Sequence, residues 1–187
     1  TQDGEREVTL RRVGEVQVAG AVYHVPAATH PDYPAISILS DVLGNTPSGR
    51  LYKSLVEPGL ATSVAAWDMA LKEAGSMAFL AEVPLDHDLE RASTALKATV
   101  EGLSAAPPTA EEVSRARNKI LRDLEISLAD PNDLGVELSE FIAVGDWRLL
   151  FLYRDAVEKV TPEQVLGVAQ QYLKPSNRTL GLFVPTT

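Results

Sequence analysis

The sequence predicts an α+β fold in which helices pack on one face of an antiparallel sheet. Two observations carry this prediction. β-rich stretches occur in sequence-adjacent pairs near the start and the middle of the chain, and helical stretches are grouped after each pair. Adjacent strands favour antiparallel hairpins, and grouped helices need a shared apolar face on which to pack. A last β-rich stretch near the end of the chain adds one more strand.

The strands are predicted from runs rich in β-branched and small residues between turn signals. The first pair covers Glu7–Val13 and Glu15–Val25, with a single glycine between them. The second pair covers Thr62–Leu71 and Ser76–Pro84, and Arg178–Val184 supplies the last strand. In the second strand, alanine and glycine lie among the valines, which leaves room for a helix to pack close to the sheet.

Two helices are predicted between the first and the second pair of strands. The first begins near His30 or Asp32, carries apolar residues at helical spacing, and is closed by Gly44-Asn45. The second is short: Ser48 is a favourable N-cap, and Pro58-Gly59 breaks the helix.

The remaining helices follow the second pair of strands, and capping boxes mark two of their starts. Pro131 ends or kinks the second of them, and Pro107-Pro108 forms a rigid break that we interpret as an internal loop. The predicted stretches are Asp86–Leu103, Val113–Leu128 after the box Thr109-Ala-Glu-Glu112, Leu134–Val144, Trp147–Val160, and a last helix from the box Thr161-Pro-Glu-Gln164 to about Lys174-Pro175.

The composition predicts one folded domain over residues 1–187. Hydrophobic residues make up 45% of the chain, enough to supply a core at this length. The net charge of −9 argues against a nucleic-acid partner, because such a partner needs a basic face. The chain has no cysteine, so disulfides, thiolate catalysis and sulfur-ligated metals are excluded. No apolar run is long enough to predict a membrane span.

The ends of the chain predict a fragment of a longer protein. The sequence starts at Thr1 without methionine or a signal peptide, and it stops at Thr187 directly after an apolar run. The absence of cysteine suits the periplasm and the cytoplasm alike, so both compartments stay open.

The residues by themselves predict no active site. The three histidines, His24, His30 and His87, do not have the spacing of a helical two-histidine zinc site. We interpret His30-Pro31-Asp32 as a turn that leads into a helix. The pair Glu111-Glu112 falls in the first turn of a helix, where acidic side chains complement the helix dipole. Neither a Gly-x-Ser-x-Gly elbow nor a glycine-rich phosphate loop occurs.

Arg50 and Tyr52 are the two candidates for contact with a substrate or with another domain. They lie together in the short second helix, where a guanidinium and a phenol could hold a peptide carbonyl or carboxylate. The alternative is structural: Tyr52 packs, and Arg50 pairs with an acid such as Asp41 or Glu57. We favour the structural interpretation, because a surface arginine usually needs no functional explanation.

Six short motifs occur in order along nearly the whole chain. In this order and spacing they resemble the M16 (pitrilysin/insulinase-type) zinc peptidases, with His30–Glu57 as the most informative stretch. The resemblance implies repeated α+β domains of about this size, which form two halves around a chamber where zinc-activated water cuts peptides. The motifs are Tyr23-His-Val-Pro-Ala, His30-Pro-Asp, Ser48-Gly-Arg-Leu-Tyr-Lys-Ser-Leu, Gly59-Leu-Ala, Thr109-Ala-Glu-Glu-Val and Thr161-Pro-Glu-Gln-Val.

The family's chemical residues are replaced in this chain. The zinc-binding pentad His-x-x-Glu-His does not occur in the sequence; placed on the catalytic repeat, it falls near Ser37-Ile-Leu-Ser-Asp41. The family holds substrate with an Arg and a Tyr in a segment that resembles Leu-Arg-Glu-x-x-Gly-Leu-Ala-Tyr. Here the segment is one residue shorter, with Val56 and Thr62 at those positions. We therefore do not transfer that role to Arg50 and Tyr52.

The resemblance thus implies a non-catalytic M16 domain, inactive when alone. It implies no cofactor in this fragment, and zinc in the catalytic domain of the parent protein. The expected partners are a catalytic M16 domain or subunit and the peptide substrate in the shared chamber. There this domain would support hydrolysis by its neighbour.

Two other functions stay open. One is a purely structural or interaction domain of an M16-like assembly without proteolysis, as in the core-type relatives of respiratory complexes. A His-x-x-Glu-His motif upstream of Thr1 would favour the peptidase over this alternative. The other is an unrelated α+β enzyme that uses acids on the sheet, which Asp and Glu substitutions would test.

Overall fold

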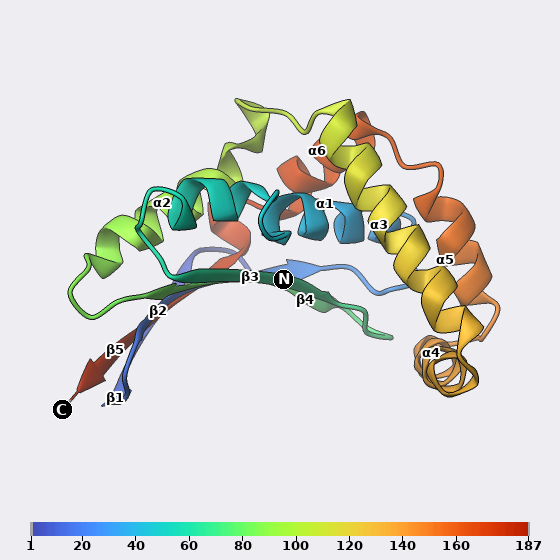
Figure 1. Cartoon of the computed structure of the whole chain (residues 1–187), viewed down its shortest axis with the longest axis horizontal. Coiled ribbons are helices and arrows are strands. Elements are labelled where there is room, and N and C mark those ends of the chain that lie inside the picture. Colours follow the sequence, from blue (N-terminus) through green and yellow to red (C-terminus); the bar gives the residue numbers. More distant parts are fainter. Residues whose placement is uncertain (1, 187) are drawn as a thin grey trace.

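The computed structural model describes residues 2–186 as a five-stranded sheet with helices packed against it (Figure 1). This confirms the predicted α+β class. The strands are β1 (Arg6–Val13), β2 (Gln17–Val25), β3 (Ser63–Met69), β4 (Gly75–Val83) and β5 (Arg178–Thr186). The helices are α1 (Tyr33–Gly44), α2 (Leu89–Glu101), α3 (Ala110–Ala129), α4 (Pro131–Val144), α5 (Leu149–Val157) and α6 (Pro162–Tyr172), with short turns η1 (Tyr52–Val56), η2 (Gly102–Ser104) and η3 (Pro175–Asn177).

The sheet is not antiparallel throughout, which corrects one part of the prediction. Its strand order is β1-β5-β2-β4-β3, and β1 runs parallel to β5. The other neighbours, β5–β2, β2–β4 and β4–β3, are antiparallel as expected. The difference arises because β5 inserts between β1 and β2, so these two sequence-adjacent strands do not form a hairpin. The pairing of β1 is set by a strand more than 160 residues away.

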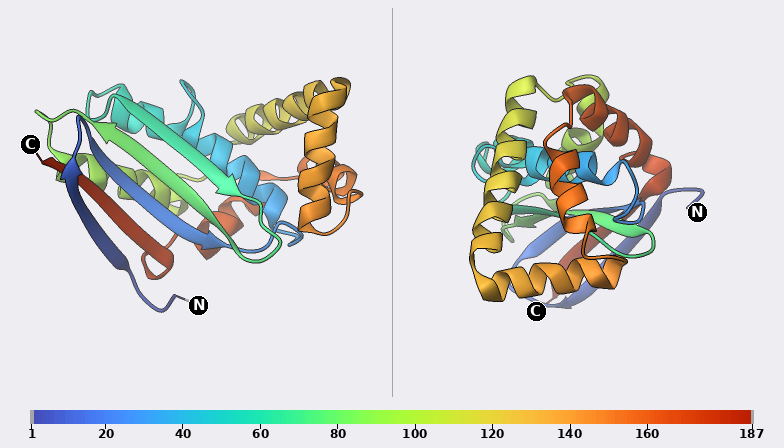
Figure 2. Two further views of the ribbon diagram at one scale, coloured as in Figure 1. Left: turned by 90° about the horizontal axis from the view of Figure 1, so that it is seen from below. Right: turned by 90° about the vertical axis from the view of Figure 1, so that its right-hand side faces the viewer.

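The helices lie on one face of the sheet, as predicted (Figures 1 and 2). Helices α1 and α2 contact the sheet directly, and α3, α5 and α6 pack around α1. Helix α4 lies at one end of the molecule and is attached chiefly to α3 and α5. Within residues 2–186, none of the helices has the length and apolar character that crossing a bilayer requires.

The core lies between the sheet and α1 and α2. Tyr23 of β2 and Phe79 of β4 are fully buried and meet edge to face, with ring centroids 6.0 Å apart. Gly44 lets the end of α1 approach β3, because a Cβ at this position would collide with the Cβ of Ala66. This close approach places the polar side chains of α1 beside those of β3.

The helix ends follow local sequence signals in most places. Thr109 and Thr161 both form complete capping boxes, at the starts of α3 and α6. Asn45 caps the end of α1 as predicted. Asp130 accepts hydrogen bonds from the first backbone N–H groups of α4, so the helix that was expected to end at Pro131 gives way directly to a second one.

Two predicted helix starts are wrong. The Ser48 hydroxyl donates to Asn45 Oδ1 at 2.9 Å instead of capping the short helix, which is a π-turn over Tyr52–Val56. Helix α2 begins at Leu89 rather than at Asp86, because Asp88 is the residue whose carboxylate accepts from the first free N–H groups. At α2 the sequence offers two acidic candidates for the cap, Asp86 and Asp88, whereas at η1 no side chain caps the first turn.

No helix of residues 2–186 covers the second face of the sheet (Figure 1). The strand register aligns residues on this face in rows across the strands, such as Trp67, Ala78, Val22 and Thr179. We call this surface the open sheet face. Its exposed apolar side chains are Val8, Leu10, Val22, Trp67 and Met69, each more than a third accessible.

Candidate functional site

The segment at which the resemblance places the zinc pentad, Ser37–Asp41, lies on α1 and borders a polar hollow. Ser37, Ser40 and Asp41 line this hollow of about 570 Å³ between α1, β3 and α3. The Ser37 hydroxyl donates a hydrogen bond of 2.9 Å to Asp68 Oδ2 on β3. The hollow thus presents hydroxyls and carboxylates rather than imidazoles.

The donors around this hollow do not fit a zinc ion. The Lys119 ammonium of α3 lies 3.5 Å from Asp41 Oδ2 and 2.8 Å from Asp123 Oδ2, and its hydrogen bond to Asp123 raises the pKa of the lysine. A charged ammonium at that place neutralises the carboxylates and repels a cation. Within residues 2–186, no group of three or more His, Cys, Asp or Glu is placed to hold a metal. These side chains lack the set of three or four ligands that zinc requires.

A second hollow of about 420 Å³ extends from Ser37 and Asp68 towards α4. Two phenols lie in its wall. Burial raises the pKa of Tyr33, and the nearby Asp68 carboxylate adds to the rise; burial raises the pKa of Tyr153 to about 12. Both phenols therefore stay protonated at neutral pH. Tyr33 is only 3% exposed, and its hydroxyl is sealed from solvent beside the Asp68 carboxylate.

Arg50 is held inside the structure by several hydrogen bonds. Its Nε donates to Glu112 Oε1 at 2.8 Å and its Nη2 to Glu112 Oε2 at 2.7 Å, a two-pronged ion pair. The same guanidinium donates to the backbone oxygens of Ala106 and Pro107. These contacts favour the structural interpretation of Arg50, with Glu112 as the acid in place of Asp41 or Glu57. They join the segment before η1 to the start of α3.

Near Tyr52 in the chain lie Val56 and Thr62, which the resemblance matches to the family's substrate-holding Arg and Tyr. Tyr52 is half-buried in η1, and no side-chain hydrogen bond to it is found among residues 2–186. Val56 ends the same turn, and the Thr62 hydroxyl donates to the backbone oxygen of Glu82 at 3.2 Å. Neither Val56 nor Thr62 offers the cation or the phenol that grips a peptide.

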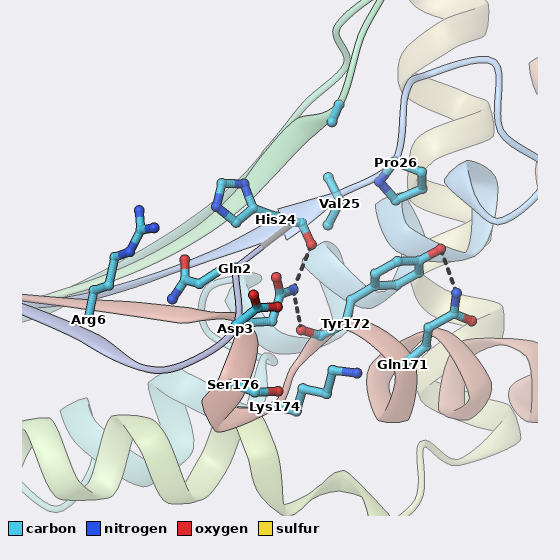
Figure 3. Close-up of a pocket in the computed structure, with 12 residues that line it drawn as sticks. Gln2, Asp3, Arg6, His24, Val25, Pro26, Gln171, Tyr172, Lys174 and Ser176 are labelled. Carbon is cyan, nitrogen blue, oxygen red and sulfur yellow. Dashed lines mark hydrogen bonds between the residues drawn. The ribbon is translucent and has the colours of Figure 1, made fainter.

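The histidines do not meet in one site. His30 and Asp32 form the predicted turn, with the Asp32 N–H donating to His30 Nδ1. His87 Nδ1 lies 2.9 Å from Asp86 Oδ1 on the surface. His24 borders a wide hollow of about 920 Å³ where β1, β2 and α6 come together (Figure 3).

The polar groups of this wide hollow mainly connect elements of the fold. Asn177 donates to the backbone oxygens of His24 and Tyr172 at 2.8 Å each, which ties the end of β2 to the end of α6 (Figure 3). Arg6, His24 and Lys174 are spread around the hollow and come from different elements (Figure 3). The arrangement offers no paired nucleophile and base, so we assign it a structural role.

A buried ionic network lies next to this hollow, at the start of β5. Arg178 of β5 is 6% exposed; it pairs with Glu101 of α2 and, at 2.6 Å, with Glu5. The Tyr23 hydroxyl donates to the same Glu101 carboxylate at 2.8 Å. This network joins β2, β5, α2 and the segment before β1.

Sequence reasoning missed Asp68, Lys119 and Tyr153, which the fold brings together around Ser37. One signal could have found Asp68. It occupies the same face of its strand as Val64 and Ala66, which pack against the core. A carboxylate at an inward strand position indicates a polar site. Lys119 and Tyr153 carry no such local signal, because their approach to α1 depends on helix packing.

A family model and solved structures of known proteins all match this chain to the same family. Residues 1–120 match the family model described as "Peptidase M16 inactive domain". The chain is 44% identical to the inactive peptidase domain of a candidate zinc protease from Bordetella parapertussis, with a TM-score of 0.88, covering 96% of this chain and 98% of that chain. It is 42% identical to a candidate zinc protease from Bordetella pertussis Tohama I, with a TM-score of 0.86 and coverage of 92% and 96%.

A curated relative is longer than this chain. Zinc protease PqqE of Helicobacter pylori is 24% identical over 186 residues, which are 98% of this chain and 42% of the relative. The chain therefore spans less than half the length of this relative.

Proposed function

Because the chain belongs to the M16 peptidase family and matches the model of its inactive domain, we propose that it supports peptide hydrolysis by a neighbouring catalytic domain or subunit. The parent protein is then a zinc metalloendopeptidase, and this part is one domain of it. The observation that carries the proposal is the surface of α1. Ser37, Ser40, Asp41 and Lys119 stand where a ligand set would be needed, while the fold around them is intact.

In this proposal the open sheet face forms a wall of the peptide chamber. The face spans the strands and exposes apolar side chains such as Leu10, Val22 and Trp67. An extended apolar surface of this kind is typical of a binding or interaction site. A wall with scattered apolar groups and few fixed hydrogen bonds suits unfolded peptides of varied sequence, because it contacts side chains without requiring a particular one.

Arg50 and Tyr52 remain candidates for substrate or interdomain contact within this proposal. The Arg50 guanidinium is already engaged with Glu112 and two backbone oxygens. Tyr52 is therefore the side chain of the two that is available for a new hydrogen bond. We expect a contact in this region to depend on Tyr52 directly and on Arg50 through the position of η1.

Hydrolysis and zinc content test the proposal. The purified chain, reconstituted with zinc, should cut no unfolded peptide by mass spectrometry and should contain far less than one zinc per chain by elemental analysis. Hydrolysis should appear when the chain is combined with the His-x-x-Glu-His domain of its parent protein, and a chelator should abolish it. Stoichiometric zinc in the chain alone, or chelator-sensitive hydrolysis by it, would overturn the proposal.

The structural alternative predicts a different outcome of the same experiment. A domain of an assembly without proteolysis would bind its neighbour but yield no hydrolysis in the combined sample. Reading the residues that precede Thr1 in the parent gene, and any adjacent reading frame, for His-x-x-Glu-His separates the two functions directly.

A further inference from the structure

Strand β1 leaves one edge of the sheet free. Among the elements of residues 2–186 it pairs with β5 alone, and in the left view of Figure 2 it is the outermost strand. All eight of its residues are exposed, so neither face of this strand is covered. Such an edge presents a row of backbone N–H and C=O groups to which another strand can add.

Most of the devices that protect an edge strand are missing from β1. Natural edge strands are short, interrupted by a bulge, or broken by proline. Strand β1 has eight residues, contains no proline, and keeps an unbroken register with β5 from Arg6 to Val13. The other edge strand, β3, is covered on one face by α1. Charged side chains are the protective device that β1 retains, and their order decides which strand can pair with it.

The order of the side chains in β1 fits a second copy of the same strand. A twofold axis perpendicular to the sheet sets two β1 strands antiparallel and opposes only residues of the same face. With the axis at Thr9, Glu7 of each copy lies opposite Arg11 of the other. Val8 likewise lies opposite Leu10, and the two threonines face each other. Opposite charges, apolar pairs and Thr–Thr pairs in these positions each stabilise an antiparallel pair of strands.

Neighbouring positions of the axis lack this complementarity. An axis one residue nearer to either end of the strand opposes Glu7 to an uncharged side chain. The axis nearer to the start of the strand sets Arg11 opposite Glu5 instead, but Glu5 lies outside β1 and already pairs with a buried arginine of β5. The axis at Thr9 is therefore the one that gives both charged residues a partner within the strand.

The charged pair is available for this contact. Neither Glu7 nor Arg11 has a side-chain hydrogen bond or an ion pair within residues 2–186. Both lie on the helical side of the sheet, since Glu7 aligns with a buried leucine of β5. The one unfavourable pair about Thr9, Arg6 with Arg12, lies at the strand ends, where long exposed side chains can turn apart into water.

We propose that two copies of this chain associate edge to edge through β1, about a twofold axis at Thr9, so that their sheets become continuous. The open sheet faces of both copies then lie on the same side, with Val8 and Leu10 at the junction. The interface is narrow, so we expect a dissociation constant of about 1–100 μM. The association does not rest on the proposed function. Glu7 and Arg11 lie away from the open sheet face, so substitutions there test association without altering the chamber wall.

Sedimentation equilibrium at several concentrations tests the association. A relative that this chain matches over 98% of its length was crystallised as a separate domain, so the purified chain is a suitable sample. The wild type should form dimers that weaken with added salt. Glu7→Arg and Arg11→Glu should each weaken the dimer at least about tenfold, because like charges then oppose each other at two places. Glu90→Arg, which changes the net charge as Glu7→Arg does but lies exposed on α2, is the control and should leave the dimer unchanged.

A mixture of the two variants gives the decisive measurement. When one Glu7→Arg chain meets one Arg11→Glu chain, an arginine opposes a glutamate at both places. The mixed dimer should therefore form with about the wild-type affinity, although neither variant pairs with itself. Thr9→Cys should also form a disulfide-linked dimer under mild oxidation, whereas Val13→Cys should not; the chain has no other cysteine.

Three results would overturn the proposal. The first is a wild type that stays monomeric up to about 100 μM, the weak limit expected for so narrow an interface. The second is a mixture of the two variants that associates no better than each variant alone. The third is a monomeric parent protein, because another of its domains or a bound peptide would then occupy the edge of β1. Melting temperatures equal to that of the wild type show that the variants are folded.

Discussion

At the scale of single residues, the Arg50–Glu112 pair determines how the start of α3 is held. Glu112 accepts from Arg50 and from the backbone N–H of Thr109, so one carboxylate serves both the ion pair and the capping box. The hydrogen bond from Arg50 is the main cause that lowers the pKa of Glu112 from its ordinary 4.5 to about 2. Both side chains are less than a fifth exposed, which limits solvent screening of the pair.

This lowered pKa predicts a specific acid sensitivity. A carboxyl whose pKa is lower in the folded chain stabilises the fold above its unfolded pKa, and this contribution is lost as the pH falls from about 5 towards 2. We expect a loss of about 1–2 kcal/mol from Glu112, allowing for partial solvation of the pair. Urea unfolding at several pH values should show this slope in the wild type and a shallower one in Glu112→Gln. Equal slopes would contradict the assignment.

At the scale of elements, the Arg178 network joins parts of the chain that are far apart in sequence. Its guanidinium is buried between Glu101 and Glu5, so its removal would leave the Glu101 carboxylate and the Tyr23 hydroxyl poorly paired beside the core. Breaking a buried ion pair by removing one partner costs about 3–5 kcal/mol. This is a large part of the stability of an ordinary domain.

Arg178→Leu should therefore lower the free energy of unfolding by about 3 kcal/mol, measured by urea denaturation at neutral pH. Arg148→Leu provides the matched control, since Arg148 also pairs with an acid, Asp146, but is 69% exposed. That substitution should cost less than about 1 kcal/mol. A similar cost for both variants would show that burial of the network does not matter.

The same scale explains which elements could be predicted. Thr109 and Thr161 mark helix starts with signals only a few residues long, and both helices begin there. The place of β1 beside β5 has no local signal, because it depends on a strand more than 160 residues further along the chain. The contact of Ser37 with Asp68 likewise depends on the close approach of α1 to β3. Helix caps that involve residues close in sequence could be predicted, whereas pairings between residues far apart in sequence could not.

The candidate surfaces divide in the same way. The absence of a His-x-x-Glu-His pentad is visible in the sequence itself, and the family resemblance points to Ser37–Asp41 as its place. Lys119 stands 3.5 Å from Asp41, and Glu137 and Phe141 of α4 border the same region as Asp68. These positions follow from how the helices pack, and the order of the helices along the chain does not determine which of them become neighbours. For Arg50, the sequence predicted a pairing with an acid but not which acid, because the partner, Glu112, is 62 residues away.

At the scale of the whole molecule, we expect substitutions on the open sheet face to affect function and substitutions on the helical side to have little effect. Val22→Glu and Leu10→Glu add charge where the side chains are already 38% and 47% exposed, so the fold should persist. If this face walls a peptide chamber, both variants should reduce peptide hydrolysis when combined with the catalytic domain. Ile126→Glu on α3, 62% exposed on the helical side, is the control and should retain hydrolysis.

Circular dichroism and melting temperature identify any variant that has lost its fold, and only folded variants count in this comparison. Loss of hydrolysis in Ile126→Glu alone would place the functional contact on the helices instead. Unchanged hydrolysis in both variants of the sheet would remove the chamber wall from the proposed function.

The insertion of β5 between β1 and β2 also has a consequence for the order of assembly. During synthesis, β2, β4 and β3 can pair through connections of moderate length, but β2 keeps an unpaired edge until β5 has been made. Strand β1 gains its partner only through β5, across nearly the whole chain, and closing so long a loop is slow. Until then the nascent domain exposes an edge to which another chain could add a strand. The last strand of this domain is thus the one that closes the centre of the sheet, and it protects the β2 edge from strand addition only once it has been made.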